Sequence, residues 1–263
     1  MVISPHAWPM LFVGLLWFVS TGAIIWLDNR PRRTFPWSMA GAGLLALVSV
    51  AGVVATGSDD SLAGAYWAFA CATVIWGWHE MSFLMGYVSG PNRLPERAGL
   101  TGWARFRSAS ATLIHHEVAL VATGLLLYAI VWNQPNHLAA DSFALLYLMR
   151  LSTKLNIFLG VPNLSTDIMP AHLAYLKSYF RTAPMNALFP VSLAGSAWLS
   201  WILWRQGIEA PAGSGPSAAA MMLFTLTAVA LLEHLFIMLP LRDSALWRWA
   251  HIKKIEAGGT HGL

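Results

Sequence analysis

Residues 63–88, AGAYWAFACATVIWGWHEMSFLMGYV, are the stretch of sequence that decides the fold, because they are apolar over a membrane-spanning length. An α-helix needs about 20 predominantly apolar residues to cross the hydrocarbon core of a bilayer. This stretch also carries His79 and Glu80, and an ionised group at such depth costs at least about 2.5–3.5 kcal/mol on insertion scales. The stretch therefore predicts a membrane-spanning helix that carries a functional group.

The whole chain has the composition of an integral membrane protein. Of its 263 residues, 57% are hydrophobic and only 11% are charged, and the mean hydropathy is +0.56. Soluble domains contain about 25% charged residues. Apolar runs predict seven spans, at residues 8–27, 38–56, 63–88, 109–132, 141–161, 187–204 and 217–239. We expect one all-α domain over residues 1–263, a polytopic helical bundle in the membrane.

The fifth predicted span is the weakest, because it carries Arg150 and Lys154. The polar stretch after it contains Pro162 and Pro170 and is compatible with a broken or re-entrant helix. An amphipathic helix is predicted to follow at residues 172–180. Whether the fifth span is continuous stays open.

The basic residues predict the orientation of the chain. One side of the seven-span topology carries Arg30, Arg32, Arg33, Arg93, Arg97, Arg105, Arg107, Lys177, Arg181, Arg242, Arg248, Lys253 and Lys254. The other side carries only Arg205. Cytoplasmic loops are enriched in Lys and Arg, so the N-terminus is predicted outside and the C-terminus in the cytoplasm.

Charge and cysteine content exclude two other classes of protein. The formal net charge of +4 does not indicate nucleic-acid binding, because the basic residues lie in loops between apolar spans. Cys71 is the one cysteine, which excludes an intrachain disulfide and a CxxC redox motif. The lipid bilayer is the partner that the composition itself indicates.

Three polar clusters interrupt the apolar spans at a similar depth. They are His79–Glu80 in the third span, His115–His116–Glu117 in the fourth, and Glu233–His234 in the seventh. Counting 1.5 Å per residue from the predicted span ends places all three about 8–14 Å below the cytoplasmic face. Independent packing residues have no reason to share a depth, so we expect one intramembrane site. Which of His115 and His116 faces it stays open.

Amide and acidic residues near the end of the fifth span extend the expected site. If the helix continues, Asn156, Gly160, Asn163 and Asp167 lie on one face. That stripe would lead from the polar layer to the cytoplasmic surface. We predict that Asn156, Asn163, Asp167 and His172 contact a bound cofactor.

Imidazole and carboxylate groups without thiolates are the ligands of non-haem iron, manganese and zinc. Three carboxylates with three or four histidines suffice for two metals bridged by carboxylate. The chain lacks the Glu-x-x-His motif of ferritin-like sites and the spaced histidine boxes of membrane desaturases. The predicted metal ligands are His79, Glu80, His115, His116, Glu117, Glu233 and His234, with two irons expected first and zinc or manganese as alternatives.

Other interpretations of these groups stay open. A single histidine can serve as axial ligand to a tetrapyrrole, either haem or a bacteriochlorophyll or its precursor. A row of ionisable groups can also form a proton or ion pathway, and Arg150 and Lys154 suit an anionic substrate. Each cluster alone can also be a hydrogen bond between packed helices.

Several segments resemble one known family. They are residues 154–164 (KLNIFLGVPNL), 170–180 (PAHLAYLKSYF), 76–86 (WGWHEMSFLMG), 115–117 (HHE) and 232–236 (LEHLF). In these segments the chain is similar to the PuhE family of photosynthetic complex assembly proteins, over roughly residues 10–250. The resemblance implies a multi-pass protein of the bacterial inner (intracytoplasmic) membrane in purple phototrophic bacteria. It also implies partners in reaction-centre and light-harvesting assembly or among bacteriochlorophyll pathway enzymes, and it supplies no catalytic residues.

Two functions follow from these observations. The first is a photosynthetic complex assembly factor linked to bacteriochlorophyll supply, with an intramembrane His/Glu site that binds a metal or a tetrapyrrole. The second is a membrane di-iron oxidoreductase that acts on a lipophilic tetrapyrrole, isoprenoid or quinone. Pigment binding predicts that one histidine dominates, whereas a di-metal enzyme needs all of Glu80, Glu117 and Glu233.

Overall fold

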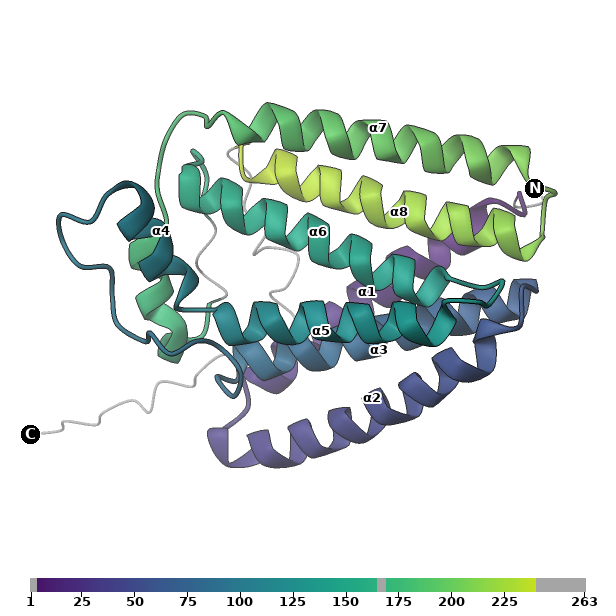
Figure 1. Cartoon of the computed structure of the whole chain (residues 1–263), viewed down its shortest axis with the longest axis horizontal. Helices are drawn as coiled ribbons and strands as arrows, with labels where there is room; N and C mark the ends of the chain where they lie inside the picture. Colours follow the sequence, from purple (N-terminus) through teal and green to yellow (C-terminus); the bar gives the residue numbers. More distant parts are fainter. Residues whose placement is uncertain (1–3, 165–168, 240–263) are drawn as a thin grey trace, which may run out of the picture.

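The computed structural model describes residues 4–164 and 169–239 of the chain. Within them, seven long helices run roughly along one axis and form a bundle (Figure 1). They are α1 (Ala7–Asp28), α2 (Phe35–Gly57), α3 (Leu62–Leu84), α5 (Ile114–Val131), α6 (Leu138–Leu159), α7 (Leu188–Glu209) and α8 (Gly215–Phe236). Each coincides with one predicted span to within about five residues, so the all-helical class is confirmed for the described residues.

Four helical segments are long and apolar enough to cross a membrane, judged by length and composition over the described residues. They are Ala7–Asp28, Arg32–Gly57, Ile114–Val131 and Gly215–Phe236. Helix α6 has a similar length but carries Asp141, Arg150 and Lys154, which lower its hydropathy. The chain is therefore a helical protein with membrane-length apolar helices, whereas the seven-span count and the orientation stay predictions.

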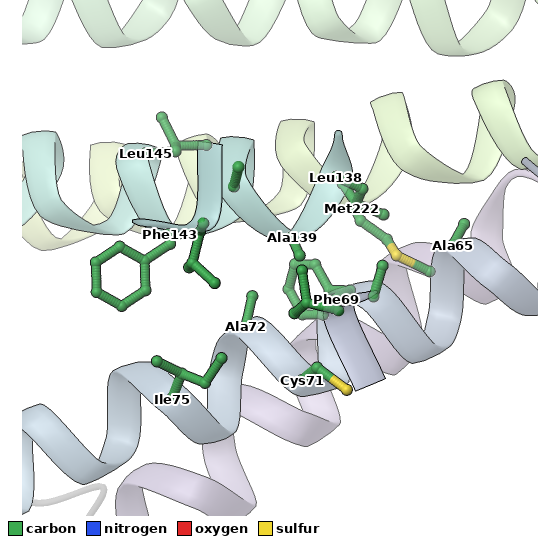
Figure 2. Close-up of a cluster of buried hydrophobic side chains, with 14 of the residues drawn as sticks. Ala65, Phe69, Cys71, Ala72, Ile75, Leu138, Ala139, Phe143, Leu145 and Met222 are labelled. Atoms are coloured by element: carbon green, nitrogen blue, oxygen red, sulfur yellow. The ribbon is translucent and has the colours of Figure 1, made fainter. Parts of the chain in front are cut away.

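Helix α3 is the centre of the bundle, because it contacts α1, α2, α5, α6 and α8. Small side chains on α3, among them Ala68 and Ala72, let neighbouring helices approach closely. Figure 2 shows Phe69, Ala72 and Phe143 in the apolar cluster between α3 and α6, with Met222 of α8 beside them. This core fixes the relative positions of the three helices that carry most of the polar groups.

In the part of the chain that the structure describes, three short helices connect the long ones. They are η1 (Arg32–Thr34), α4 (Gly102–Ser110) and η2 (Ala171–Tyr179). Helix α4 lies at one end of the bundle (Figure 1). The fourth predicted span, residues 109–132, begins too early, because α4 ends at Ser110 and α5 begins only at Ile114. The 3-10 helix η2 occupies the place of the predicted amphipathic helix.

The end of α6 is set by a glycine and an arginine. Gly160 has a φ of +126°, in the region that favours glycine, so the helix ends at Leu159. Arg105 of α4 then donates hydrogen bonds to the carbonyl oxygens of Phe158 and Tyr179 at 3.1 and 2.7 Å. These bonds tie α4, α6 and η2 together. The end of α6 at Leu159 excludes a continuous helical stripe from Asn156 through Asn163.

The polar clusters lie nearer the helix ends than the spans predict. Helix α3 ends four residues after Glu80, and α5 begins three residues before Glu117. At 1.5 Å per residue these groups are about 4–6 Å from the helix ends, rather than 8–14 Å. The cause is the connecting segment, which folds back so that the N–H of His116 donates to the carbonyl oxygen of Ser89 at 3.0 Å.

Candidate functional site

Helices α3 and α5 bring Glu80 and His116 together. Both side chains are buried, and His116 is only 1% exposed. Its Nε2 atom lies 3.9 Å from Oε1 of Glu80. His115 is exposed, because adjacent residues on a helix point about 100° apart. His116 is therefore the histidine of this pair that faces the interior.

Two basic residues on α6 face these carboxylates. Arg150 and Lys154 are four residues apart and therefore share one face of the helix. Nη2 of Arg150 donates to Oε2 of Glu80 at 3.4 Å, and Nζ of Lys154 donates to Oε1 of Glu117 at 2.7 Å. We call Glu80, His116, Glu117, Arg150 and Lys154 the ion-pair centre.

The ion-pair centre keeps unused hydrogen-bonding capacity. Among the residues that the structure describes, both ring nitrogens of His116, Oε1 of Glu80 and Oε2 of Glu117 have no hydrogen-bond partner. The ring of Phe83 covers the imidazole of His116 at a centroid distance of 4.7 Å. Nearly all buried polar groups in native proteins are paired, so this set of groups is the best candidate for contact with a ligand.

The opposite face of α6 carries a second polar cluster. Oγ of Ser152 lies 2.9 Å from Nε2 of His234 on α8 and 2.9 Å from Oγ of Ser192 on α7. Nδ2 of Asn156 donates to Oγ of Ser192 at 3.0 Å. We call Asn156, Ser192, Ser152 and His234 the hydrogen-bond chain. It joins α6, α7 and α8.

Both ring nitrogens of His234 are paired. Nδ1 lies 2.8 Å from the carbonyl oxygen of Ala230, which can only accept, so Nδ1 carries a proton. Nε2 lies 2.9 Å from the hydroxyl of Ser152, which donates its own hydrogen to Oγ of Ser192. Each ring nitrogen of His234 therefore has a polar neighbour within hydrogen-bond distance, unlike the ring nitrogens of His116.

Two other members of the predicted metal set have different surroundings. Nε2 of His79 lies 2.9 Å from the hydroxyl of Thr123, and its ring packs edge-on against Trp78 and Phe143. Glu233 is half-buried and attracts Arg150 electrostatically, together with Glu117. His79 thus packs between α3 and α5, whereas Glu233 contributes to the charge around the ion-pair centre.

Two of the predicted cofactor-binding residues that follow α6, Asn163 and His172, form hydrogen bonds with carbonyl oxygens at the ends of other helices. Nδ2 of Asn163 donates to the carbonyl oxygens of Phe236 and Leu239 at 2.9 and 2.7 Å, at the end of α8. Nε2 of His172 lies 2.7 Å from the carbonyl oxygen of Leu84, the last residue of α3. These bonds satisfy carbonyl groups that a helix leaves unpaired at its C-terminus. Asp167 lies outside the described residues.

The predicted metal ligands do not gather at one point in residues 4–164 and 169–239. No three His, Cys, Asp or Glu side chains there lie close enough together to hold a metal ion. The hydrogen bonds place His234 on one face of α6 and the carboxylates Glu80 and Glu117 on the other, beside two cations. The two-iron site, and its zinc or manganese alternatives, stay predictions.

Sequence reasoning did not single out the hydroxyl groups that complete these clusters. Ser152, Ser192 and Thr123 supply the partners of His234, Asn156 and His79. Ser152 could have been found from the sequence, because it lies four residues before Asn156 and therefore on the same face of the helix. Ser192 and Thr123 had no comparable signal, because hydroxyl residues are common at interfaces between membrane helices.

The fold and the site together define a class of protein. It is a helical protein with membrane-length apolar helices and a buried centre of paired charges. The chain belongs to the DUF3623 family, described as a protein of unknown function, whose family profile matches residues 3–257.

One relative and the solved structures add to this comparison. A similar protein of Rhodobacter capsulatus is named an uncharacterized 30.4 kDa protein in the 5′ region of puhA. It is 39% identical over 240 residues, which cover 89% of this chain and 86% of that protein. No solved structure matches the chain.

Proposed function

We propose that this chain is a multi-pass protein of the bacterial inner (intracytoplasmic) membrane that takes part in photosynthetic complex assembly, in a step linked to bacteriochlorophyll supply. Two observations support this role. Five segments resemble the PuhE family of assembly proteins, and the similar Rhodobacter capsulatus protein is named for its place beside puhA. The shared puh designation links the two observations.

The topology that we propose has seven spans, with the N-terminus outside and the C-terminus in the cytoplasm. The seven long helices have similar lengths, from 18 to 23 residues. All Lys and Arg residues of the loops except Arg205 fall on one side of this topology, in agreement with the positive-inside rule. The ion-pair centre then lies near the cytoplasmic ends of the helices.

The working site that we propose is the ion-pair centre. The observation that carries it is the buried imidazole of His116, whose ring nitrogens have no hydrogen-bond partner among the described residues. Arg150 and Lys154 stabilise the charged forms of Glu80 and Glu117. The free carboxylate oxygens can accept hydrogen bonds, and the imidazole can donate a lone pair. This set of groups fits a ligand with a Lewis-acidic metal centre, such as a tetrapyrrole.

A ring nitrogen of His116 would hold the metal of a tetrapyrrole, which would supply the light-absorbing and redox chemistry of its macrocycle. His116 is 1% exposed, so binding requires movement of the segment that covers the start of α5. That segment includes Ser89, whose carbonyl oxygen holds the backbone of His116. The proposal therefore places pigment contact and a local opening at the same point.

The experiment compares the two adjacent histidines. The gene is deleted in the phototrophic host and restored with wild-type, His116→Ala or His115→Ala protein. We expect loss of the absorption of the photosynthetic complexes on deletion, recovery with His115→Ala, and no recovery with His116→Ala at equal protein level. Unchanged complexes in the deletion strain would refute the role. Recovery with His116→Ala would refute the site alone.

Purified protein from the same strains identifies the ligand class. A tetrapyrrole absorption band that disappears in His116→Ala supports the pigment role. Two irons per chain, lost in Glu117→Ala and Glu233→Ala, would instead support the di-iron oxidoreductase.

A further inference from the structure

A cleft of about 750 Å³ lies at the end of the bundle, beyond the ion-pair centre. Its walls are the segment of residues 96–102, the start of α4, the last residues of α6, and residues near Arg181. Phe158 in this wall is one helical turn beyond Lys154 on α6. The cleft is therefore separate from the centre, although both depend on the position of α6.

The cleft has an excess of positive charge. Three arginines, Arg97, Arg105 and Arg181, and one carboxylate, Glu96, line it. Arg105 is engaged, because its Nε donates to Oε1 of Glu96 at 2.8 Å and its other nitrogens hold two carbonyl oxygens. The exposed guanidinium groups of Arg97 and Arg181 make no hydrogen bond or ion pair within the described part of the chain. Two arginines thus remain available to a ligand.

The backbone of the cleft also suits an anion. Helix α4 begins at Gly102 in its wall, and the N-cap residue Thr101 makes no side-chain capping bond. The first N–H groups of a helix attract negative charge. Gly99 and Gly102 have φ values of +82° and +52°, and no other group lies within 4 Å of where their Cβ atoms would be. A ligand can therefore approach this backbone closely.

The residues around the cleft favour an anion that is part of a lipid. Trp103, which follows the cleft residues on α4, is 69% exposed and stacks on Phe106 at 5.1 Å. Exposed tryptophans are typical of the membrane–water interface, where lipid phosphates also lie. The cleft is at the end of a bundle that contains four membrane-length apolar segments. We propose that this cleft binds the phosphate of an anionic membrane lipid.

This site differs from a general excess of basic residues on one side of the membrane. Arg33 and Arg107 are exposed on the same predicted side but do not line the cleft. A general electrostatic attraction would depend on these two arginines as much as on Arg97 and Arg181. A built site depends on Arg97 and Arg181, whose guanidinium groups can hold phosphate oxygens in pairs.

The test measures lipid binding to the full-length protein in detergent, by native mass spectrometry and thermal unfolding. The probes are phosphatidylglycerol, phosphatidylcholine and inorganic phosphate. We expect preferential binding of phosphatidylglycerol, weakened about tenfold in Arg97→Gln/Arg181→Gln. The control variant Arg33→Gln/Arg107→Gln, which loses the same charge, should bind it like wild type. Both variants should unfold at the wild-type temperature without lipid, because these side chains make no hydrogen bond or ion pair with the residues that the structure describes.

Three results would overturn the proposal. Equal binding of the two lipids would exclude recognition of an anionic headgroup. Equal weakening in the control variant would show that surface charge alone attracts the lipid. Stabilisation by inorganic phosphate alone, lost in Arg97→Gln/Arg181→Gln, would assign the cleft to free phosphate instead of lipid. None of these results depends on a role in photosynthetic assembly.

Discussion

On the face of α6 that meets α3 and α5, the buried imidazole of His116 has no hydrogen-bond partner among the described residues and lies among paired charges. On the face that meets α7 and α8, the equally buried imidazole of His234 has a partner for each ring nitrogen. One helix therefore separates an ion-pair centre whose histidine has no hydrogen-bond partner from a hydrogen-bond chain in which the histidine is paired at both nitrogens and Oδ1 of Asn156 is the atom left without a partner among the described residues.

The contrast teaches which buried polar groups to assign to packing and which to function. A satisfied buried network stabilises a specific arrangement of helices and needs no ligand. Unpaired buried groups destabilise the folded protein by about 1–3 kcal/mol each, so their presence calls for another explanation. Substitutions on the two faces of α6 should therefore have different, and in one case opposite, effects on stability.

The largest expected effect is on the ion pair between Lys154 and Glu117. These side chains are 22% and 11% exposed, so Glu117→Gln leaves a largely buried ammonium without its counter-charge. We expect a loss of about 3 kcal/mol in the free energy of unfolding, measured by denaturation in mixed micelles. The double variant Glu117→Gln/Lys154→Met should recover most of it. Arg205→Gln, which breaks the exposed pair with Glu209, is the control and should change little.

If Glu117→Gln and the double variant were equally unstable, the ion pair would not be the reason for the loss. The glutamate would then act through its packing. That result would also remove the distinction between the charged face of α6 and its hydroxyl-bearing face.

The next effect is on the hydrogen-bond chain. His234→Leu keeps a side chain of similar size but removes the imidazole nitrogen that pairs with the hydroxyl of Ser152. We expect a loss of about 2 kcal/mol, because the hydroxyl of Ser152 loses one of its two partners and the carbonyl oxygen of Ala230 loses the imidazole N–H. The loss in His234→Leu/Ser152→Ala should be smaller than the sum of the two single losses, since the residues share one bond. Strictly additive losses in this double-mutant cycle would show that the chain does not couple them.

A His→Leu substitution on the other face of α6 should change the free energy of unfolding in the opposite direction. His116→Leu replaces a buried imidazole that has no hydrogen-bond partner among the described residues, and Glu80 keeps its ion pair with Arg150. We therefore expect stability to rise by about 1 kcal/mol. The variant should nevertheless fail to restore the photosynthetic complexes in a deletion strain. A stability loss as large as that of His234→Leu would mean that His116 has a structural partner, and the comparison between the faces would fail.

The arrangement of helices could be predicted from the sequence much better than the site. Apolar runs located all seven long helices, because burial or lipid contact of a whole helix needs about 20 apolar residues. Their ends were missed by up to about five residues where a polar segment folds back, as between Gly102 and Ile114. Because these helix ends were misplaced, the predicted distance of the polar groups from the helix termini was too large by about one helical turn.

The sequence analysis assigned the predicted metal ligands to one common centre, whereas the hydrogen bonds place His234 and the carboxylates of Glu80 and Glu117 on different faces of α6. The sequence predicts how far along a helix a residue lies. The direction in which its side chain points depends on how three helices pack together. A rotation of 100° separates His115 from His116, and a rotation of about 200° separates the Arg150 face from the Ser152 face. Gly160 broke the predicted stripe, because its positive φ ends α6 before Asn163.

The smallest expected effect concerns His172, a histidine that is paired like His234 but lies outside the long helices. Nε2 of His172 donates to the carbonyl oxygen of Leu84, and burial, with the charges of Arg32 and Arg93, lowers the pKa of His172. As the pH falls through about 6.5, the unfolded chain therefore takes up a proton that the folded chain does not, and stability decreases until the lowered pKa is passed. We expect wild-type protein to lose a small part of its free energy of unfolding over this range in detergent. His172→Gln retains a donor for Leu84 and should flatten this part of the pH profile, whereas His115→Gln, at an exposed histidine, should leave it unchanged.

An unaltered acid slope in His172→Gln would mean that pairing to a helix end does not keep this histidine neutral. The distinction between satisfied and unsatisfied histidines would then apply only to the interior of the bundle, on the two faces of α6.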